Sequence, residues 1–278
     1  MKNWQQLLGV ALIGSMMAGC SNARLPVSPQ QTQARIISQS GFRATTGAYY
    51  DSVKNLNGRV LLQSLARLVG PHKNLGYDKA RDVMFADVDD LDNNNIVECD
   101  YTNRSIDHVK DRGSAFQNGR GFNTEHTWPQ SKGAVGVAKA DLHHLFPTDI
   151  DANSRRGSFP FGEVVDVEWS EGGSKLGKDA RGRMVFEPRD EQKGNTARAL
   201  LYFYTVYSNH VDTVNFKVEE PVLLKWHAKD PVNAADRARN EAVYRFQGNR
   251  NPYVDMPEFV DRVGRFLNPP DIKFFDYR

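Results

Sequence analysis

The stretch TARALLYFYTVY, residues 196–207, places the strongest limit on how this chain folds. It is apolar on most faces of a helix, and Asn195-Thr196 at its beginning is typical of a helix start. A helix without a clear polar face has to be surrounded by other elements. We therefore expect these residues to lie deep in the core of the folded part of the chain.

Other segments predict the elements around that helix. Leu61, Leu65 and Leu68 recur at helical spacing, and Gly70-Pro71 ends the pattern. The remaining elements are two amphipathic helices and two short strands, predicted respectively at 234–247, 257–267, 83–85 and 96–97. No internal repeat is visible, so a single α+β domain of mixed helices is the simplest fold class.

The first 19 residues have the pattern of a secretory signal. One lysine precedes an apolar run from Leu7 to Ala18, which is too short to remain as a membrane-spanning helix. Small residues directly before Cys20 indicate a lipoprotein signal, with cleavage before Cys20 and lipidation of that cysteine. Ordinary secretion, with Cys20 lost or free, is the alternative. Residues 20–42 are predicted to be a polar linker, and 43–278 the folded domain.

Charge and cysteine content restrict the explanations of binding and stability. The chain has 36 basic and 34 acidic residues, so any phosphate-binding site has to come from local clustering. If Cys20 is lipidated, Cys99 is the one remaining cysteine and no intramolecular disulfide can form. A domain of about 240 residues buries roughly 70–75% of its unfolded surface, which is enough to be held by its core.

The run ADVDDLDNNN, residues 86–95, is the one segment that suggests calcium. In an EF-hand register starting at Asp87, Leu91 takes the fifth position and Asp92 takes the sixth, where glycine is required. These departures favour a solvated turn between strands over a calcium loop.

Glu125 and His126 are adjacent in GFNTEHTWPQSKG, residues 121–133. Successive residues of a regular strand face opposite sides, so the pair can serve one site only at a strand end, a bulge or a turn. Trp128-Pro129 indicates such an irregularity, because the residue before a proline is disfavoured in the helical region. Taken alone, a surface glutamate beside a half-buried histidine explains the pair equally well.

A second segment, DLHHLFPTDIDANSRRGSFPFG at 141–162, continues the pattern. It predicts a short strand at 142–146 and then a short helix at 149–156, with Thr148 as its N-cap. Asn153 lies on that helix. The order strand, strand, helix therefore carries Glu125-His126, a histidine pair and Asn153 in turn.

That order resembles the endonuclease I family of secreted and periplasmic nucleases. The matching pieces are NTEHTWPQS, DLHHLFPTDIDANSRRG with PFG after it, FEPRDEQKGNTARALLYFY and QGNRNPYVDMPEFV. The resemblance extends from about residue 48 to residue 263. It implies an α+β single domain built around a ββα-metal, or His-Me finger, active site.

The resemblance also implies roles for three residues. Glu125 and Asn153 would be metal ligands, and His126 would be the catalytic general base that activates water. One carboxylate and one amide oxygen are hard ligands that suit Mg²⁺, or Mn²⁺ or Ca²⁺, whereas a closed zinc site needs Cys and His. An imidazole with an ordinary pKa near 6.5 is a suitable base at neutral pH.

Further side chains are candidates for contacts with substrate: Arg155, Arg156, His143 and Lys132. Either arginine can bind phosphate through its guanidinium fork, and a helix-end charge or a salt bridge is the alternative. His143 and its neighbour His144 cannot both face the site from a regular strand, so one is expected to pack or to bond to the backbone.

The segment after Glu125-His126 departs from the family pattern. Some members carry an insertion there with an arginine that stabilises the product. This chain has the short stretch WPQSKGAVGVAKADLHHL instead, without arginine. Lys132 and Lys139 are the cations left to take its place.

We therefore expect a divalent-metal-dependent, largely sequence-nonspecific endonuclease that hydrolyses phosphodiester bonds of DNA, with RNA as a further substrate. One alternative is a metal-dependent phosphodiesterase or phosphatase acting on small substrates. Another is a non-catalytic, calcium-stabilised envelope protein. The expected form is an exported monomer, periplasmic, extracellular or attached to the outer membrane through a lipidated Cys20.

Overall fold

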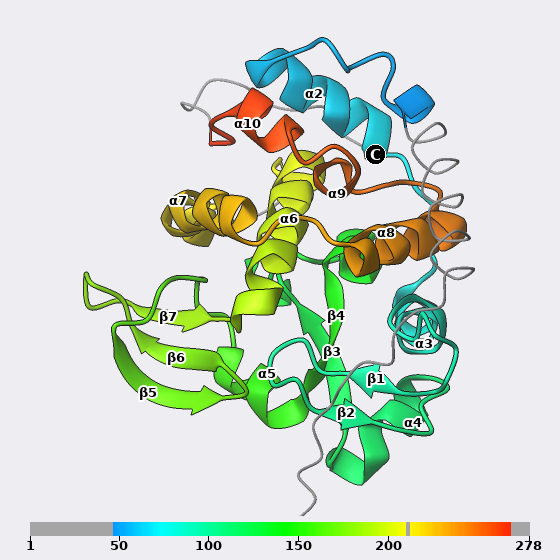
Figure 1. Ribbon diagram of the computed structural model, residues 1–278, viewed down its shortest axis with the longest axis vertical. Coiled ribbons are helices and arrows are strands. Elements are labelled where there is room, and N and C mark those ends of the chain that lie inside the picture. Colours follow the sequence, from blue (N-terminus) through cyan, green and yellow to red (C-terminus); the bar gives the residue numbers. More distant parts are fainter. Residues whose placement is uncertain (1–46, 210–211, 268–278) are drawn as a thin grey trace, which may run out of the picture. The chain divides into compact units, whose positions relative to one another are not determined.

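The computed structural model describes residues 47–209 and 212–267 (Figure 1). The chain divides between Tyr49 and Tyr50 into two compact units, and only residues 47–49 of the first unit are described. The second unit holds every element named below. The predicted signal peptide at 1–19, the lipidation site at Cys20 and the linker at 20–42 lie outside the described residues. Among the helices that are described, none is long and apolar enough to span a membrane.

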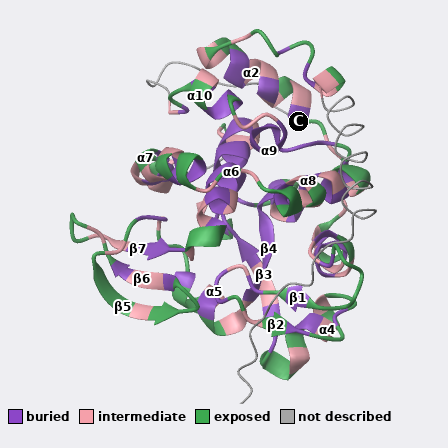
Figure 2. Ribbon diagram, in the orientation of Figure 1, coloured by how far each residue is buried: buried purple, intermediate pink, exposed green. Residues whose placement is uncertain are grey.

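Helix α6, Asp190–Tyr207, forms the centre of the core (Figure 2). Its side chains are buried almost continuously from Thr196 to Thr205, which confirms the prediction from its apolar sequence. Helix α7, Val214–Lys229, packs along it, with the Tyr204 ring stacked on Phe216 at 4.4 Å between centroids. The helix begins earlier than predicted, because Asp190 and Glu191 supply the acids that favour a first helical turn.

The other helices surround this centre on several sides. Helix α2 ends before Gly70 and confirms the prediction there, whereas the predicted strand at 83–85 is wrong, since those residues end α3 and begin a π-helical turn. The remaining helices are α2, Gly58–Val69; α3, Tyr77–Val83; α4, Arg112–Phe116; α5, Ile150–Arg156; α8, Ala234–Gln247; α9, Pro252–Asp255; and α10, Phe259–Val263.

The described strands form three small antiparallel sheets. One sheet pairs β1 with β2, a second pairs β3 with β4, and a third has the order β5-β6-β7. The strands are β1, Val97–Glu98; β2, Ser105–Ile106; β3, Phe122–His126; β4, Leu145–Asp149; β5, Asp166–Glu171; β6, Ser174–Lys178; and β7, Met184–Glu187. Helices around small sheets in one unit confirm the predicted α+β fold class.

Two carboxylates of the acidic run at 86–95, those of Asp89 and Asp90, bond inside the protein, whereas Asp87 and Asp92 are exposed. Asp89 accepts hydrogen bonds from Arg239 at 2.7 and 3.1 Å, and Asp90 accepts from the backbone amides of Asn94 and Asn95 at 3.0 and 2.9 Å. In the described ranges no group of three or more His, Cys, Asp or Glu side chains is arranged to hold a metal ion. The segment is therefore held both by Arg239 of α8 and by its own backbone amides, and it connects the π-helical turn Met84–Val88 to β1, not two strands as predicted.

Glu219 on α7 gives the fold a testable pH dependence. Its carboxylate accepts a hydrogen bond from the Phe161 amide at 2.8 Å, and burial raises its pKa from 4.5 to about 7. Because the folded-state pKa is the higher one, this contribution to stability is complete below pH 4.5 and is lost as pH rises to about 7. A shift of this size corresponds to about 3 kcal/mol.

Glu219→Gln should therefore be more stable than the wild type at pH 8, by up to about 3 kcal/mol in the free energy of unfolding, and similar at pH 4.5. Urea unfolding at the two pH values measures the difference, and Gln keeps the acceptor oxygen for Phe161. Glu163→Gln is the control, since Glu163 forms an exposed pair with Lys225. Equal pH dependence in wild type and Glu219→Gln would contradict the assignment.

Candidate active site at the β3-β4-α5 motif

Strands β3 and β4 and helix α5 form a continuous ββα motif. In the antiparallel register, Glu125 lies opposite Phe146 and His126 lies opposite Leu145, and α5 begins at the residue after β4 ends. The predicted strand at 142–146 is displaced, because residues Leu142–His144 form a 3₁₀ turn and the strand starts after them.

The helix start also differs from the prediction. Asp149 caps α5 with its side chain, which accepts from the Asp151 amide at 3.0 Å. Thr148 lies one residue before the cap position, and its hydroxyl lies 3.5 Å from the Cys99 sulfur instead. The predicted end of the helix at Gly157 is confirmed.

Glu125 and His126 lie at the end of β3, one of the places where neighbouring residues can serve one site. His126 is the last residue of the strand, and both side chains are buried, at 2% and 6% exposure. They contact different neighbours: the carboxylate meets Tyr101 and Arg156, and the imidazole meets Tyr77. The reading of Glu125 as a surface residue is therefore wrong.

The Glu125 carboxylate is held through one of its two oxygens. Oε1 accepts from the Tyr101 hydroxyl at 2.9 Å and forms an ion pair with Nε of Arg156 at 3.0 Å. No described residue donates a hydrogen bond to Oε2. Burial raises the pKa of Glu125, and the Arg156 charge and the Tyr101 hydroxyl act against that rise. The free oxygen is available to a cation.

Asn153 is anchored to the same motif through its amide nitrogen. Nδ2 donates to Oδ1 of Asn123 at 2.7 Å and to the Thr124 carbonyl at 3.3 Å, and both acceptors belong to β3. The bonds tie α5 to the strand that carries Glu125. They leave Oδ1 of Asn153 as an unused acceptor, which is the hard oxygen donor that a small divalent cation prefers.

The surroundings of His126 fix which nitrogen carries its proton. Nε2 lies 3.1 Å from the carbonyl oxygen of Lys139, and a carbonyl only accepts, so Nε2 donates. Nδ1 then carries the lone pair. Burial lowers the pKa of His126 to about 3, and nearby positive charge adds to that effect, so the ring is neutral at pH 7. A neutral imidazole with a free lone pair can accept a proton.

The two candidate arginines on α5 have different environments. Arg155 is exposed and pairs with Asp151 on the same helix, at 3.6 Å. Arg156 is 1% exposed and donates to the Thr127 and Gly157 carbonyls at 2.6 and 2.7 Å, besides its pair with Glu125. Arg156 therefore lies in the interior and braces the Glu125 carboxylate.

The other candidates are occupied inside the protein. His143 bonds to the Asn249 carbonyl at 3.2 Å and His144 to the Ala138 carbonyl at 2.6 Å. Burial lowers the pKa of each to about 4. Lys132 forms an ion pair with Asp212 at 3.1 Å. The sequence predicted that one of the two histidines would pack or bond to the backbone. In the structure both of them do.

Sequence reasoning missed Tyr101 and Tyr77. Tyr101 follows β1 and is 24 residues away from Glu125, and it is fully buried against Phe186, with ring centroids 4.7 Å apart. Tyr77 starts α3, and its ring centroid lies 5.5 Å from that of His126. No local pattern marks either residue, because both meet the site only through tertiary packing.

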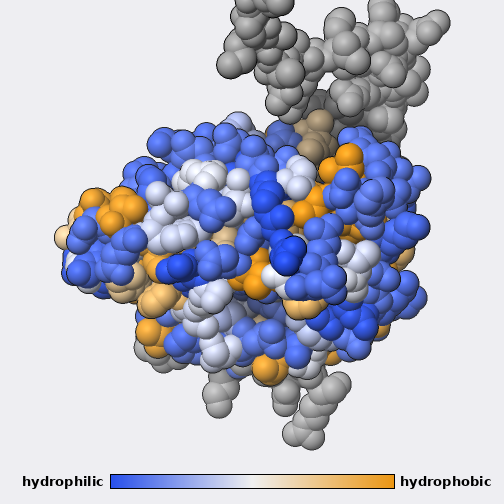
Figure 3. Space-filling model, turned by 90° about the horizontal axis from the view of Figure 1, so that it is seen from below, coloured by the Kyte–Doolittle hydropathy of each residue, from blue (hydrophilic) through white to orange (hydrophobic). Residues whose placement is uncertain are grey.

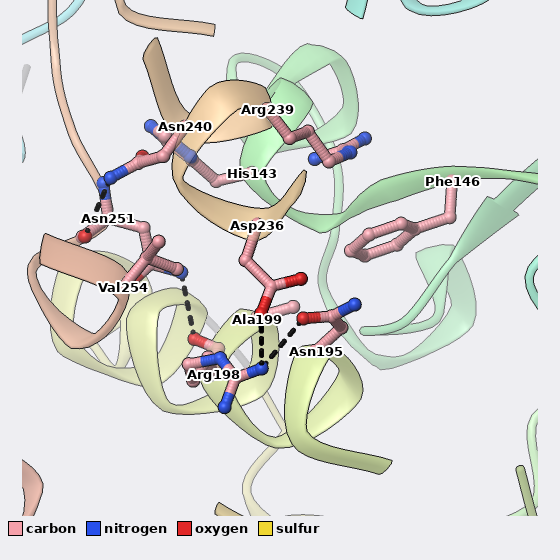
Figure 4. A pocket seen from close by; sticks show the side chains of 10 residues that line it. All are labelled: His143, Phe146, Asn195, Arg198, Ala199, Asp236, Arg239, Asn240, Asn251 and Val254. Atoms are coloured by element: carbon pink, nitrogen blue, oxygen red, sulfur yellow. Dashed lines mark hydrogen bonds and ion pairs between the residues drawn. The ribbon is translucent and has the colours of Figure 1, made fainter. Parts of the chain in front are cut away.

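A pocket lies behind the motif, between β4, α6 and α8 (Figure 4). Its volume is about 30 Å³, which accommodates water but no nucleotide. Arg198 and Arg239 line it, and each pairs with an acid, Asp236 at 3.1 Å and Asp89 at 2.7 Å. Arg198 is 1% exposed and therefore forms a buried structural pair. The pocket is therefore not a substrate site.

The surface nearest α5 is mainly hydrophilic. Figure 3 views the molecule from the side on which Figure 1 draws α5, β2 and β5. Hydrophobic residues form several small patches, one of them at the end where the β5-β6-β7 sheet lies, and blue residues cover most of the remainder. Such a face suits a polar ligand.

Comparison with known proteins identifies a family and several related sequences. Residues 58–258 match the model of the family described as Endonuclease I. The extracellular ribonuclease of Bacillus amyloliquefaciens is 33% identical over 254 residues, covering 84% of this chain and 82% of the relative. The extracellular ribonuclease of Bacillus subtilis (strain 168) is 31% identical over 265 residues, covering 87% and 88%.

A third relative, an extracellular deoxyribonuclease of Aeromonas hydrophila, is 28% identical over 117 residues, covering 42% of this chain and 49% of the relative. The fold and these matches define a nuclease, a hydrolase of nucleic acid. Within that class, the chain belongs to the endonuclease I family.

Proposed function

We propose that this chain is a divalent-metal-dependent endonuclease that hydrolyses phosphodiester bonds in RNA and DNA with little sequence preference. The observation that carries the proposal is the set of unused atoms on one motif. Glu125 and Asn153 each keep an oxygen without a described donor, and His126 keeps a lone pair on Nδ1.

The residues present fit a hard divalent cation such as Mg²⁺, Mn²⁺ or Ca²⁺. Glu125 supplies a carboxylate oxygen in a buried place, and Asn153 supplies a neutral amide oxygen. Mg²⁺ commonly takes one or two protein oxygens and keeps several waters, which leaves positions for phosphate. When bound, the cation polarises the phosphate and offsets its negative charge.

The protein's own groups then take distinct roles. His126 accepts a proton from the attacking water at Nδ1, while the Lys139 carbonyl holds Nε2 and keeps the ring in the correct tautomer. Arg156 and Tyr101 hold Glu125 in one orientation. Asn123 and Thr124 do the same for Asn153.

The substrate class follows from the relatives and from the exposed charges. The two relatives that match most of the chain are named ribonucleases, and partial matches are named deoxyribonucleases. Contacts to phosphate carry no sequence information. Arg155 is the exposed candidate for such a contact, whereas Arg156 and His143 take structural roles in this proposal.

We further propose that the protein is exported. The predicted signal at 1–19 fits relatives named extracellular or periplasmic. Lipidation at Cys20 is proposed from the small residues that precede it. The lipid anchor and the monomeric state rest on sequence alone. Globomycin, which blocks lipoprotein signal processing, would cause a larger precursor to accumulate if Cys20 is lipidated, and would have no effect after ordinary secretion.

Cleavage assays test the proposed function directly. Purified protein with Mg²⁺ should convert supercoiled plasmid to nicked and linear forms and should fragment a long single-stranded RNA. It should leave nitrophenyl phosphate intact, which separates it from the phosphatase alternative. Release of nitrophenol without strand cleavage would overturn the proposal. Absence of both activities would favour the non-catalytic alternative.

A further inference from the structure

Lys139 occupies an unusual place beside the proposed base. It lies in the 3₁₀ turn Ala138–Ala140, and its carbonyl oxygen accepts the hydrogen bond from His126. Its ammonium nitrogen lies 4.2 Å from the centre of the Tyr77 ring, and that ring centre lies 5.5 Å from the His126 ring centre. Both distances are measured to the Tyr77 ring centre. The ammonium therefore lies no farther from the His126 ring centre than the two distances combined.

In the described ranges 47–209 and 212–267, Lys139 forms no ion pair within 4.0 Å. The carboxylate that responds to its charge, Asp78, is already paired with Arg81 at 2.5 Å and Arg112 at 3.4 Å. Other cations around the motif are compensated: Arg156 by Glu125 at 3.0 Å, Lys132 by Asp212 at 3.1 Å, and Arg104 by Asp149. Lys139 is half-buried, and no carboxylate in direct contact compensates its charge. An anion that arrives with substrate would supply the missing charge.

Tyr77 holds this cation in place. Helix α3 packs against the turn that carries Lys139, and the Tyr77 ring contacts both Lys139 and the guanidinium of Arg81, each at 4.2 Å. Arg81 bonds to Asp78 at 2.5 Å, so its charge is answered within α3. Of the two cations on the ring, only Lys139 remains free to meet phosphate.

We propose that Lys139 donates a hydrogen bond to a non-bridging oxygen of the scissile phosphate, with Tyr77 as its positioning residue. The inference rests on the proposed nuclease function. Lys139 keeps its proton throughout, so no covalent bond forms or breaks at the ammonium. Its charge opposes the negative charge that develops as the bond to water forms and the bond to the leaving sugar oxygen breaks.

Substitutions that separate charge from shape test the proposal. Lys139→Met keeps the alkyl stem and removes the charge, and kcat for plasmid cleavage should fall by about 10²-fold with little change in KM. Lys139→Arg should retain most of the activity. Tyr77→Leu should lower kcat by about 10-fold through misplacement of the ammonium, and Tyr77→Phe should stay close to wild type.

Controls separate this effect from damage to the fold. Lys229→Met removes an exposed lysine from α7 and should leave kcat unchanged. Thermal unfolding of each variant checks that it is folded, and Lys139→Gln serves in place of Lys139→Met if the latter does not fold. Lys139→Arg is expected to keep the activity that Lys139→Met loses. A purely structural role for Lys139 would not predict that difference.

The outcomes distinguish this inference from the proposed function. If the wild type does not cleave plasmid or RNA, the proposed function fails and Lys139 has no catalytic role. If the wild type cleaves, His126→Ala does not, and Lys139→Met keeps its kcat, only the assignment of Lys139 is overturned. A raised KM with unchanged kcat also overturns it, because the contact would then be to a flanking phosphate.

Discussion

Replacing His126 with alanine is expected to lower kcat for plasmid and RNA cleavage by about 10²- to 10⁴-fold. The Lys139 carbonyl keeps the proton on Nε2 and leaves Nδ1 as the proton acceptor. Burial keeps the His126 ring neutral at pH 7. The ring can therefore accept a proton directly, because it does not first have to release one. Steady-state rates at saturating substrate and Mg²⁺ measure the effect, and KM should change much less than kcat.

His108 provides a matched control for this substitution. Its side chain is 91% exposed, and its backbone φ of 58° is a conformation that asparagine tolerates better than most residues. His108→Asn should therefore cleave at the wild-type rate. If His126→Ala kept its rate within about tenfold of the wild type, the general-base role would be lost.

The parts of the fold that could be predicted from sequence are those set by local patterns. The apolar sequence of α6 indicated burial because a helix without a polar face has no surface orientation, and Gly70 marked the end of α2. The prediction of a strand at 83–85 was wrong because three consecutive apolar residues fit the end of a helix as well as a strand. At β4, the 3₁₀ turn of Leu142–His144 displaced the start by three residues.

The site divides in the same way. The order of Glu125, His126 and Asn153 along the chain predicted a ββα motif, and the described geometry has that motif. Arg155 and Arg156 were equal candidates in sequence, because a helix of seven residues is too short to fix which face is buried. Their neighbours in three dimensions decided that only Arg156 turns inward.

Tyr101 and Tyr77 show what local patterns leave out. Each approaches the motif from a different element, Tyr101 from the loop after β1 and Tyr77 from α3. The interactions with Glu125 and His126 depend on long-range packing, which a single sequence does not encode in its spacing. The cation that meets phosphate was left open between Lys132 and Lys139, and the ion pair of Lys132 with Asp212 favours Lys139.

Removing divalent cations is expected to lower cleavage by at least about 10³-fold, since Lewis-acid stabilisation of a phosphoryl oxygen contributes several kcal/mol. EDTA should stop plasmid cleavage, and excess Mg²⁺ should restore it. The physical reason is the composition of the motif. His126 is neutral at pH 7, and Arg156 is engaged with Glu125, so neither offsets the phosphate charge. Cleavage that persists in EDTA after exhaustive dialysis would contradict the proposal.

Ligand substitutions locate the cation within the protein. Bound Mg²⁺ or Mn²⁺ should raise the unfolding temperature of the wild type, because a ligand that binds only the folded state stabilises it. Glu125→Gln removes the carboxylate charge and Asn153→Ala removes the amide oxygen, so both should lose most of that rise. Asn55→Ala, at an exposed position, should keep it. An equal rise in all variants would place the cation elsewhere. Glu125 and Asn153 would then serve only to join β3 to α5, through Arg156 and Asn123.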